Sequence, residues 1–309
     1  MLEAKWTREG GWEAPKIVPF HDLTLHPASS VLHYALECFE GTKAYKGEDG
    51  KIRLFRIKDN MKRMNSSSKH IALPEFDIDE AAKCIEELPA LGVNESNSAL
   101  FYTIASPAGP YFPSGFTAIK LLADTKHVRA WPGGTGNKKL GSNYDGGMYP
   151  NILAKEKGYQ QILWLFGEDH LVTEAGLMNA FIFWVNDNGV LELLTPSLDD
   201  GTILPGITRD SILQITRKWG EFQVTEGSIT MKQVLKASRE GRIREFFGAG
   251  TAAVIAPVKE IGYEGIDIKI PLDINDPTSE SGPLAKRIYN EIMNIQYGNI
   301  EHEWSTVVE

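Results

Sequence analysis

A glycine-rich segment divides this chain of 309 residues into two parts. Residues 128–136 read VRAWPGGTG and combine one proline with three glycines. Proline and glycine interrupt helices and strands, so such a run is typical of a linker between domains. A chain of this length can also form two compact domains. We therefore predict a small N-terminal domain over 1–127, an interdomain linker over 128–136 and a larger domain over 137–309.

Helical and extended patterns alternate irregularly on both sides of this linker. The stretch up to Pro27 looks like a loop. Helices are expected over 59–68, 78–88, 151–157, 208–220, 231–240 and 283–296. Strands are expected over 42–45, 51–56, 100–105, 118–123, 161–166, 171–176, 181–185, 190–194, 221–224, 244–247 and 252–258. This irregular order favours an α+β fold over a doubly wound parallel sheet.

Composition excludes several classes of function. The formal net charge of −9 and the pI near 5.4 argue against nucleic acid as the main partner. No apolar run is long enough for a transmembrane helix, and the start lacks the apolar core of a secretory signal. Two cysteines indicate buried or semi-buried thiols in a reducing compartment, and the histidines form no HExxH motif, so no catalytic metal is expected. We expect a cytoplasmic protein, or a mitochondrial matrix protein if a presequence has been removed.

Lys139 lies in a glycine-rich loop, GGTGNKKLGSNY, five residues before Tyr144. Glycines allow the backbone to approach a ligand closely. A lysine amine held there could form a Schiff base with an aldehyde cofactor. The alternative is an ordinary solvated surface lysine.

Three further features suit an anionic aromatic cofactor. Residues 204–210 (LPGITRD) open a helix, whose first N–H groups and dipole favour a phosphate. Residues 248–253 (GAGTAA) form a small-residue turn with one hydroxyl, which could also face an anion. Glu174 lies between apolar segments, where its carboxylate needs a partner such as a pyridinium nitrogen. An ordinary helix start, a tight turn and a salt bridge are the respective alternatives.

With these features in this order, the chain resembles the branched-chain amino acid aminotransferases, fold type IV pyridoxal-phosphate enzymes, and most of all the animal-type members. The resemblance covers nearly the whole chain. The matching stretches are 26–27, 32–34, 39–44, 60–64, 109–112, 128–131, 139–144, 161–178, 204–209, 247–252 and 295–298. It implies a small N-terminal α/β sandwich, a larger C-terminal pseudo-barrel domain, pyridoxal 5′-phosphate as cofactor and a homodimer.

The resemblance also implies roles for residues around the cofactor ring. Lys139 would hold the cofactor as an internal aldimine and move the proton between Cα and C4′. Tyr144 would hydrogen-bond the phenolate oxygen, and Glu174 would pair with the pyridine nitrogen and maintain the electron sink. Asn179, which closes the same motif, is expected among the cofactor-binding residues.

Other positions are implied to bind the phosphate or the substrate. The phosphate would be held by Arg63, by the amides of Ile207 and Thr208, and by Thr251. The substrate pocket would be lined by Tyr34, Phe39, Thr251 and Ala252. The implied reaction moves an amino group between leucine, isoleucine or valine and 2-oxoglutarate. A D-amino acid transaminase or a chorismate-pathway lyase of the same fold, and a cofactor-binding pseudoenzyme, are the alternatives.

The chain departs from the family pattern at three places. After Leu88 the sequence runs almost directly to the strand at Leu100, so a strand carrying a Tyr-x-Arg pattern and its hairpin look absent. This departure is what favours the pseudoenzyme alternative. Leu177 stands where the family has threonine, and Ala253 and Ala256 replace paired cysteines of vertebrate members.

Overall fold

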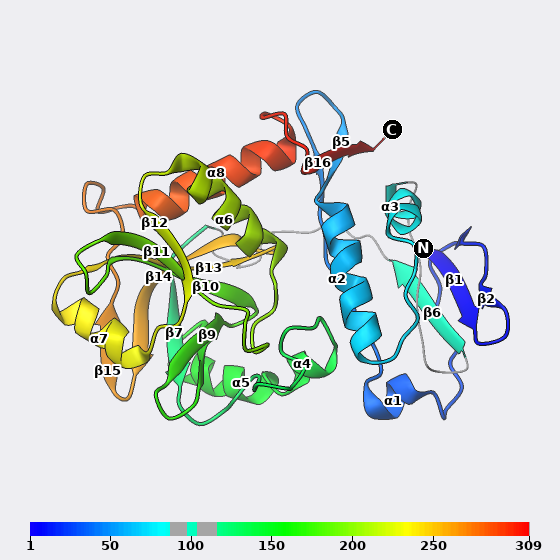
Figure 1. Cartoon of the computed structure of the whole chain (residues 1–309), viewed down its shortest axis with the longest axis horizontal. Helices are drawn as coiled ribbons and strands as arrows, with labels where there is room; N and C mark the ends of the chain where they lie inside the picture. Colours follow the sequence, from blue (N-terminus) through cyan, green and yellow to red (C-terminus); the bar gives the residue numbers. More distant parts are fainter. Residues whose placement is uncertain (87–97, 104–115, 309) are drawn as a thin grey trace. The chain divides into compact units, whose positions relative to one another are not determined.

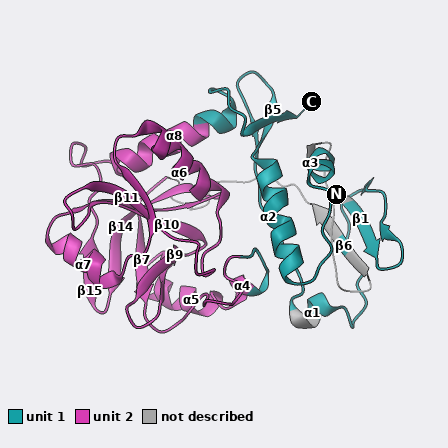
Figure 2. Cartoon of the chain, in the orientation of Figure 1, with its two compact units in different colours: residues 1–109, 138–142, 294–309 teal, residues 110–137, 143–293 magenta. Residues whose placement is uncertain are grey.

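The computed structural model describes residues 1–86, 98–103 and 116–308. The chain forms two compact units (Figure 2). Unit 1 comprises Met1–Gly109, Lys138–Ser142 and Asn294–Glu309, and unit 2 comprises Pro110–Asn137 and Asn143–Met293.

Two small sheets form the framework of unit 1. One contains β1 (Leu2–Thr7), β2 (Gly11–Trp12), β3 (Lys16–Ile17) and β6 (Ser98–Thr103), and every pair in it is antiparallel. The prediction of a loop up to Pro27 was therefore wrong. β1 is stabilised by pairing with β6, almost a hundred residues away, and such a partner is invisible in the local sequence.

The second sheet of unit 1 contains the strands that were expected over 42–45 and 51–56. β4 (Ala44–Lys46) and β5 (Ile52–Phe55) are antiparallel, and β16 (Ser305–Val308) pairs with β5 on its other side. The short helix α1 (Ser30–Tyr34) precedes them, and α2 (Ile57–His70) and α3 (Ile78–Glu86) follow. The core of unit 1 is built from Ala4, Leu54, Ile57, Met61, Met64, Phe76, Ala81 and Ala82.

Unit 2 is built on a nine-stranded sheet that closes on itself (Figure 1). Its strands are β7 (Ile119–Asp124), β8 (Gln161–Phe166), β9 (Leu171–Ala175), β10 (Met178–Val185), β11 (Leu191–Pro196), β12 (Gln223–Gly227), β13 (Ile243–Gly250), β14 (Val254–Tyr263) and β15 (Ile266–Lys269). The order β10-β13-β14-β7-β8-β9 becomes a ring because β9 also pairs with β10. This closed, barrel-like sheet with added helices confirms the α+β prediction and the pseudo-barrel.

Unit 2 contains α5 (Met148–Glu156), α6 (Ile207–Trp219) and α7 (Met231–Arg239), together with most of α4 (Ser142–Asp145) and of α8 (Pro283–Tyr297). α6 begins after the N-cap Gly206 and ends at Trp219, and its C-cap Gly220 has a φ of 67°, the left-handed conformation that glycine adopts readily. The aromatic rings of Phe181 and Phe247 stack in the core at a centroid distance of 5.2 Å. No helix among the described residues is both long and apolar enough to cross a membrane.

The compact units divide the chain differently from the predicted domains. β7, expected in the small domain, pairs with β14 and β8 in the barrel of unit 2. The predicted linker at 128–136 lies within unit 2, whereas the C-terminal β16 belongs to unit 1. Backbone pairing between distant segments sets these boundaries, and a proline–glycine run marks only a local break.

Candidate active site

The backbone around Lys139 is fixed on both sides within unit 1. Its N–H donates to Ser67 Oγ on α2 at 2.8 Å, and its carbonyl accepts the Phe39 N–H at 3.0 Å. Cys38 and Leu140 form an antiparallel bridge beside it. The amine Nζ lies over the Phe39 ring, 4.4 Å from the ring centroid. The glycine-rich loop therefore presents an oriented amine, held against an aromatic face that attracts its positive charge.

Arg63 lies on the buried face of α2 and pairs with Glu40. Its Nε and Nη2 donate to the two carboxylate oxygens at 2.6 and 2.7 Å, and both side chains are 8% exposed. Asn60 Nδ2 also donates to Glu40, at 2.8 Å. This bidentate ion pair orients the Arg63 guanidinium. Glu40 had no predicted role, although it stands directly after the predicted pocket residue Phe39.

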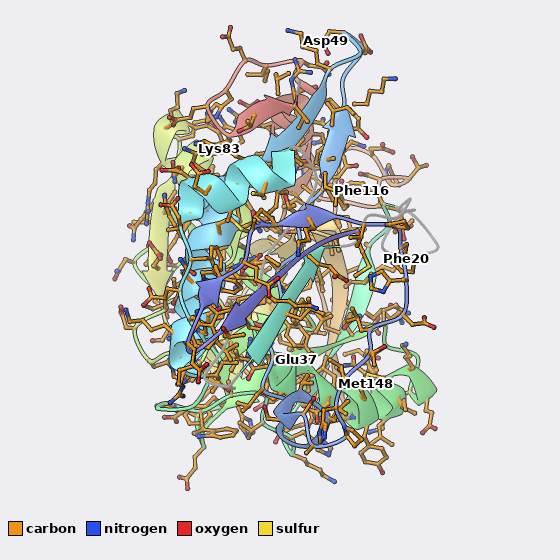
Figure 3. The ribbon with its side chains drawn as sticks, turned by 90° about the vertical axis from the view of Figure 1, so that its right-hand side faces the viewer. Phe20, Glu37, Asp49, Lys83, Phe116 and Met148 are labelled. Carbon is orange, nitrogen blue, oxygen red and sulfur yellow. The ribbon has the colours of Figure 1, made fainter. Side chains whose placement is uncertain are left out.

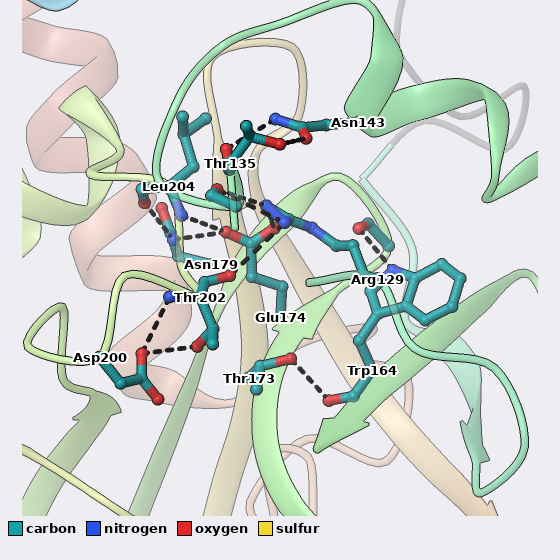
Figure 4. A network of polar contacts seen from close by, with 12 residues as sticks. Arg129, Thr135, Asn143, Trp164, Thr173, Glu174, Asn179, Asp200, Thr202 and Leu204 are labelled. Atoms are coloured by element: carbon teal, nitrogen blue, oxygen red, sulfur yellow. Dashed lines mark hydrogen bonds and ion pairs between the residues drawn. The ribbon is translucent and has the colours of Figure 1, made fainter. Parts of the chain in front are cut away.

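Glu174 is the buried centre of a polar network in unit 2 (Figure 4). Its side chain is only 4% exposed. Oε1 accepts the Leu204 N–H at 2.8 Å and lies 3.4 Å from Asn179 Nδ2, while Oε2 lies 2.8 Å from Arg129 Nη2. Asn179 also donates to the Leu204 carbonyl at 2.9 Å. The salt bridge that was the alternative for Glu174 is therefore present, and its partner, Arg129, had been assigned no role.

The start of α6 lies against the same network. Asn179 and Glu174 are opposite each other in the β9–β10 pair, and Asn179 reaches toward Gly206. A Cβ on Gly206 would lie 2.0 Å from Asn179 Oδ1, so the close approach requires glycine. Gly206 offers no side-chain cap, so the first amides of the helix, at Ile207 and Thr208, form the kind of donor set that binds anions.

Thr251 and Ala252 lie in the turn between β13 and β14, with Thr251 half-buried and Ala252 exposed. The prediction that the whole stretch 248–253 is a turn was wrong, since β13 continues to Gly250. Ala249 is the register partner of Asn179, which brings the β13 end beside the Glu174 network. Pairing with β10 and β14 keeps residues 248–250 at the end of β13 extended.

Tyr144 is half-buried on α4, a single-turn helix in the loop that follows Lys139. Its neighbour Asn143 ties this turn to the glycine loop: Thr135 Oγ1 donates to Asn143 Oδ1 at 2.6 Å, and Asn143 Nδ2 donates to the Thr135 carbonyl at 2.9 Å.

The predicted residues thus form two groups. Lys139, Phe39 and Arg63 belong to unit 1, whereas Tyr144, Glu174, Asn179, Ile207, Thr208, Thr251 and Ala252 belong to unit 2. The side chain of Tyr34 and residues 87–97, where a strand is expected to be missing, lie outside the described part. A separate groove of about 620 Å³ in unit 2, between β13, β15 and the start of α8, contains none of the predicted site residues.

Comparisons of sequence identify relatives of this chain. A family model described as amino-transferase class IV matches residues 37–261. A branched-chain-amino-acid aminotransferase of Dictyostelium discoideum is 49% identical and is covered over 87% of its length, with 100% of this chain aligned. A cytosolic one of Mus musculus and a mitochondrial one of Bos taurus are each 46% identical, covering 99% and 98% of this chain and 84% and 83% of theirs. Relatives therefore occur in both compartments.

The alignments also reveal a difference in length. The comparison with the Dictyostelium protein extends over 335 positions, 26 more than the 309 residues of this chain. The relative therefore carries residues that this chain lacks, as the short connection after Leu88 suggests.

Solved structures share the fold. A branched-chain aminotransferase of Thermoproteus uzoniensis, solved with norvaline, has a TM-score of 0.73 at 26% identity and covers 93% of this chain and 94% of its own. The Escherichia coli branched-chain amino acid aminotransferase gives the same TM-score and coverages at 24% identity.

Proposed function

The chain belongs to the class IV amino-transferase family and, within it, to the branched-chain-amino-acid aminotransferases, and from this premise we propose its reaction and the residues that perform it. The enzyme would move the amino group between L-leucine, L-isoleucine or L-valine and 2-oxoglutarate. Pyridoxal 5′-phosphate is the cofactor of this family, and a branched-chain aminotransferase from Thermobaculum terrenum was solved in its form with that cofactor.

The observation that carries this proposal is the buried Glu174 carboxylate beside the uncapped start of α6. A deeply buried carboxylate suits a protonated ring nitrogen, and the amides of Ile207 and Thr208 suit a phosphate. The Leu204 N–H and Asn179 hold Glu174 and Gly206 close together, so the two functions adjoin. The donor set therefore fits pyridoxal phosphate, which carries a nitrogen and a phosphate on one small ring.

When bound, pyridoxal phosphate supplies an electron sink for the negative charge that develops at the substrate Cα. Lys139 Nζ would hold the cofactor aldehyde carbon and then carry the proton removed from Cα. Glu174 would keep the ring nitrogen protonated, and Tyr144 would donate to the phenolate oxygen. Asn179 would act through Glu174, because it contacts that carboxylate and the Leu204 carbonyl.

The remaining predicted residues would bind the anionic groups and the substrate side chain. Arg63, oriented by Glu40, and Thr251 would join the α6 amides at the phosphate. Phe39, whose ring underlies the Lys139 amine, is 41% exposed and offers an apolar wall. Tyr34 and Ala252 would complete the pocket, which suits the branched aliphatic side chains of the proposed substrates.

We further propose that the enzyme is a homodimer. Among the large apolar side chains of unit 2 that are more than half exposed, five belong to residues 128–152: Val128, Trp131, Met148, Tyr149 and Ile152. Met148 lies at the surface in Figure 3, and the Tyr149 ring contacts that of His127, next to Val128, at 6.3 Å. We call these five residues the α5 patch. Exposed apolar patches are typical of interaction surfaces, and a second copy of the chain is the proposed partner.

We propose a compartment for the enzyme from its relatives, which include cytosolic and mitochondrial aminotransferases. We place it in the cytoplasm, with the mitochondrial matrix as the alternative.

A second candidate function is cofactor binding without turnover. The 26 additional aligned positions of the Dictyostelium relative favour it, because a missing segment could remove part of the substrate side of the site while leaving the cofactor residues intact.

Replacing Lys139 tests the assignment of the cofactor lysine. We expect Lys139→Ala to lose the visible absorption of the bound cofactor and to transaminate leucine at least ~100-fold more slowly. Lys138→Ala is the matched control, because Lys138 is the preceding lysine of the same loop and donates to Ser66 Oγ at 3.2 Å. Retention of the visible band in Lys139→Ala, or its loss in Lys138→Ala, would refute the assignment.

A further inference from the structure

Arg129 links three segments of unit 2 that contain proposed cofactor residues or adjoin them (Figure 4). Its Nη2 lies 2.8 Å from Glu174 Oε2 on β9 and donates to the Gly136 carbonyl at 3.2 Å, in the loop that precedes Lys139. Longer contacts of 3.5 Å join Nη1 to the carbonyls of Gly136 and Thr202. Thr202 lies just before Leu204 and α6.

The packing around these contacts is tight. A Cβ on Gly136 would lie 2.4 Å from Ala130 Cβ and 2.7 Å from the Thr202 carbonyl oxygen, so the two loops meet without room for a side chain. Asp200 Oδ1 holds Thr202 by accepting from both its N–H and its hydroxyl, at 2.9 and 2.7 Å. The Arg129 guanidinium therefore occupies a defined place between firmly held backbone segments.

The charges of Arg129 and Glu174 compensate each other. Their side chains are 12% and 4% exposed. A carboxylate buried to this extent is costly to keep ionised without a cation, and removal of the cation favours uptake of a proton. A neutral carboxylic acid would stabilise a protonated ring nitrogen much less than a carboxylate does.

We propose that Arg129 is a positioning residue that keeps Glu174 ionised and orients its carboxylate toward the cofactor ring. The inference rests on the proposed function in one respect, namely that Glu174 meets the ring nitrogen. Arg129 itself acts through Glu174 and through the carbonyls of Gly136 and Thr202. The positive charge of Arg129 keeps Glu174 ionised, and its planar guanidinium holds the segments at Gly136 and Thr202.

The charge effect can be measured without the reaction. We expect Arg129→Met, in the cofactor-free protein at neutral pH, to show an infrared band of a protonated carboxyl group that wild type lacks. The band should be absent from the double variant Arg129→Met/Glu174→Gln, which assigns it to Glu174. Arg129→Lys should not show it, because a lysine restores the positive charge.

The effect of Arg129 on cofactor binding is measured in the enzyme with bound pyridoxal phosphate. We expect Arg129→Met to weaken pyridoxal phosphate binding about 10- to 100-fold, the range known for loss of a group that orients a metal ligand. It should also shift the pH at which the visible band changes. The cofactor affinity of Arg129→Lys should fall between those of wild type and Arg129→Met, since lysine lacks the planar guanidinium and its several donors.

Arg242→Met is the matched control. Arg242 is 17% exposed, donates to the Val185 carbonyl and pairs with Asp187 and Glu240 in unit 2, away from the Glu174 network. It should change neither the infrared band nor cofactor affinity.

A folded Arg129→Met protein with no new carboxyl band and with wild-type cofactor affinity would overturn the proposal. If Arg129→Met does not fold, wild-type affinity and an unshifted visible band in Arg129→Lys overturn the orienting role. If Glu174→Gln alone leaves the cofactor band and affinity unchanged, the proposed role of Glu174 fails, whereas the infrared result still decides whether Arg129 keeps Glu174 ionised.

Discussion

At the scale of single residues, the site combines groups that sequence patterns reveal with groups that they do not. Lys139 and Glu174 stand out because a lysine among glycines and a carboxylate among apolar residues are both unusual. Glu40 and Arg129 also lie in polar networks, but their partners are 23 and 45 residues away in sequence. Nothing in the local pattern of either residue signals such a pairing.

Leu177 is predicted to tune substrate preference. It is 55% exposed at the β9–β10 turn, and a Cβ on Gly250 would lie 3.7 Å from its carbonyl oxygen, close to Thr251. We expect Leu177→Thr to lower kcat/KM for leucine about 3- to 10-fold, because apolar contact area is lost, and to affect glutamate less.

Steady-state kinetics with both amino acids would measure this. Leu191→Thr is the control, since Leu191 is a partly exposed leucine of β11 that lines the separate groove. An equal loss for leucine and glutamate would count against a pocket role for Leu177.

At the scale of elements, the position of α6 depends on ionic contacts as well as on its C-cap, Gly220. Arg209 in its first turn is almost fully buried and donates to Glu226 on β12 at 2.9 Å, and Arg217 in its last turn donates to the other oxygen of Glu226 at 2.8 Å. The helix α6 was predicted well from sequence. The turn between β13 and β14 was predicted too long, because Gly248 and Gly250, which would usually mark a turn, are kept extended by strand pairing.

The Glu226 contacts predict a pH-dependent stability. Hydrogen bonding from Arg217, assisted by Arg209, lowers the pKa of Glu226 below its ordinary value of 4.5. A lowered folded-state pKa stabilises the fold above pH 4.5, and this contribution is lost as the pH falls through the lowered value. Glu226→Gln should therefore reduce the free energy of unfolding by about 1–2 kcal/mol at pH 7, less than for a fully buried pair because Glu226 is partly exposed.

Denaturant titrations at pH 7 and at pH 3 measure this effect, and the difference between wild type and variant should shrink at the lower pH. Glu221→Gln is the control, because Glu221 also binds an arginine, Arg287, by two contacts, but both side chains are about half exposed. A loss of stability in Glu226→Gln that is the same at both pH values would contradict the ionic explanation.

At the scale of the whole molecule, the predicted α+β class and the barrel-like sheet were confirmed, but compact-unit boundaries could not be found by reading along the chain. β7 and β16 each pair with strands that lie far from them in sequence, at β14 and β5. Within 128–136, Gly136 instead permits close packing against Ala130 and Thr202.

The α5 patch predicts the oligomeric state. We expect the wild-type protein to sediment as a dimer, and Met148→Glu/Ile152→Glu to sediment as a monomer, because two charges would be buried without partners at the interface. Ile274→Glu is the control, since Ile274 is 87% exposed and lies outside the patch. A dimer that persists in the double variant would exclude the patch as the interface.

Titration of the purified protein with pyridoxal phosphate and then with L-leucine tests the central claim most directly. We predict a visible band on binding, its conversion to the shorter-wavelength pyridoxamine form by leucine, and its return on adding 2-oxoglutarate. This would demonstrate both halves of the transamination in a chain shorter than its relatives. A band that leucine leaves unchanged would contradict the proposed activity and favour cofactor binding without turnover, and no band at all would contradict the cofactor site itself.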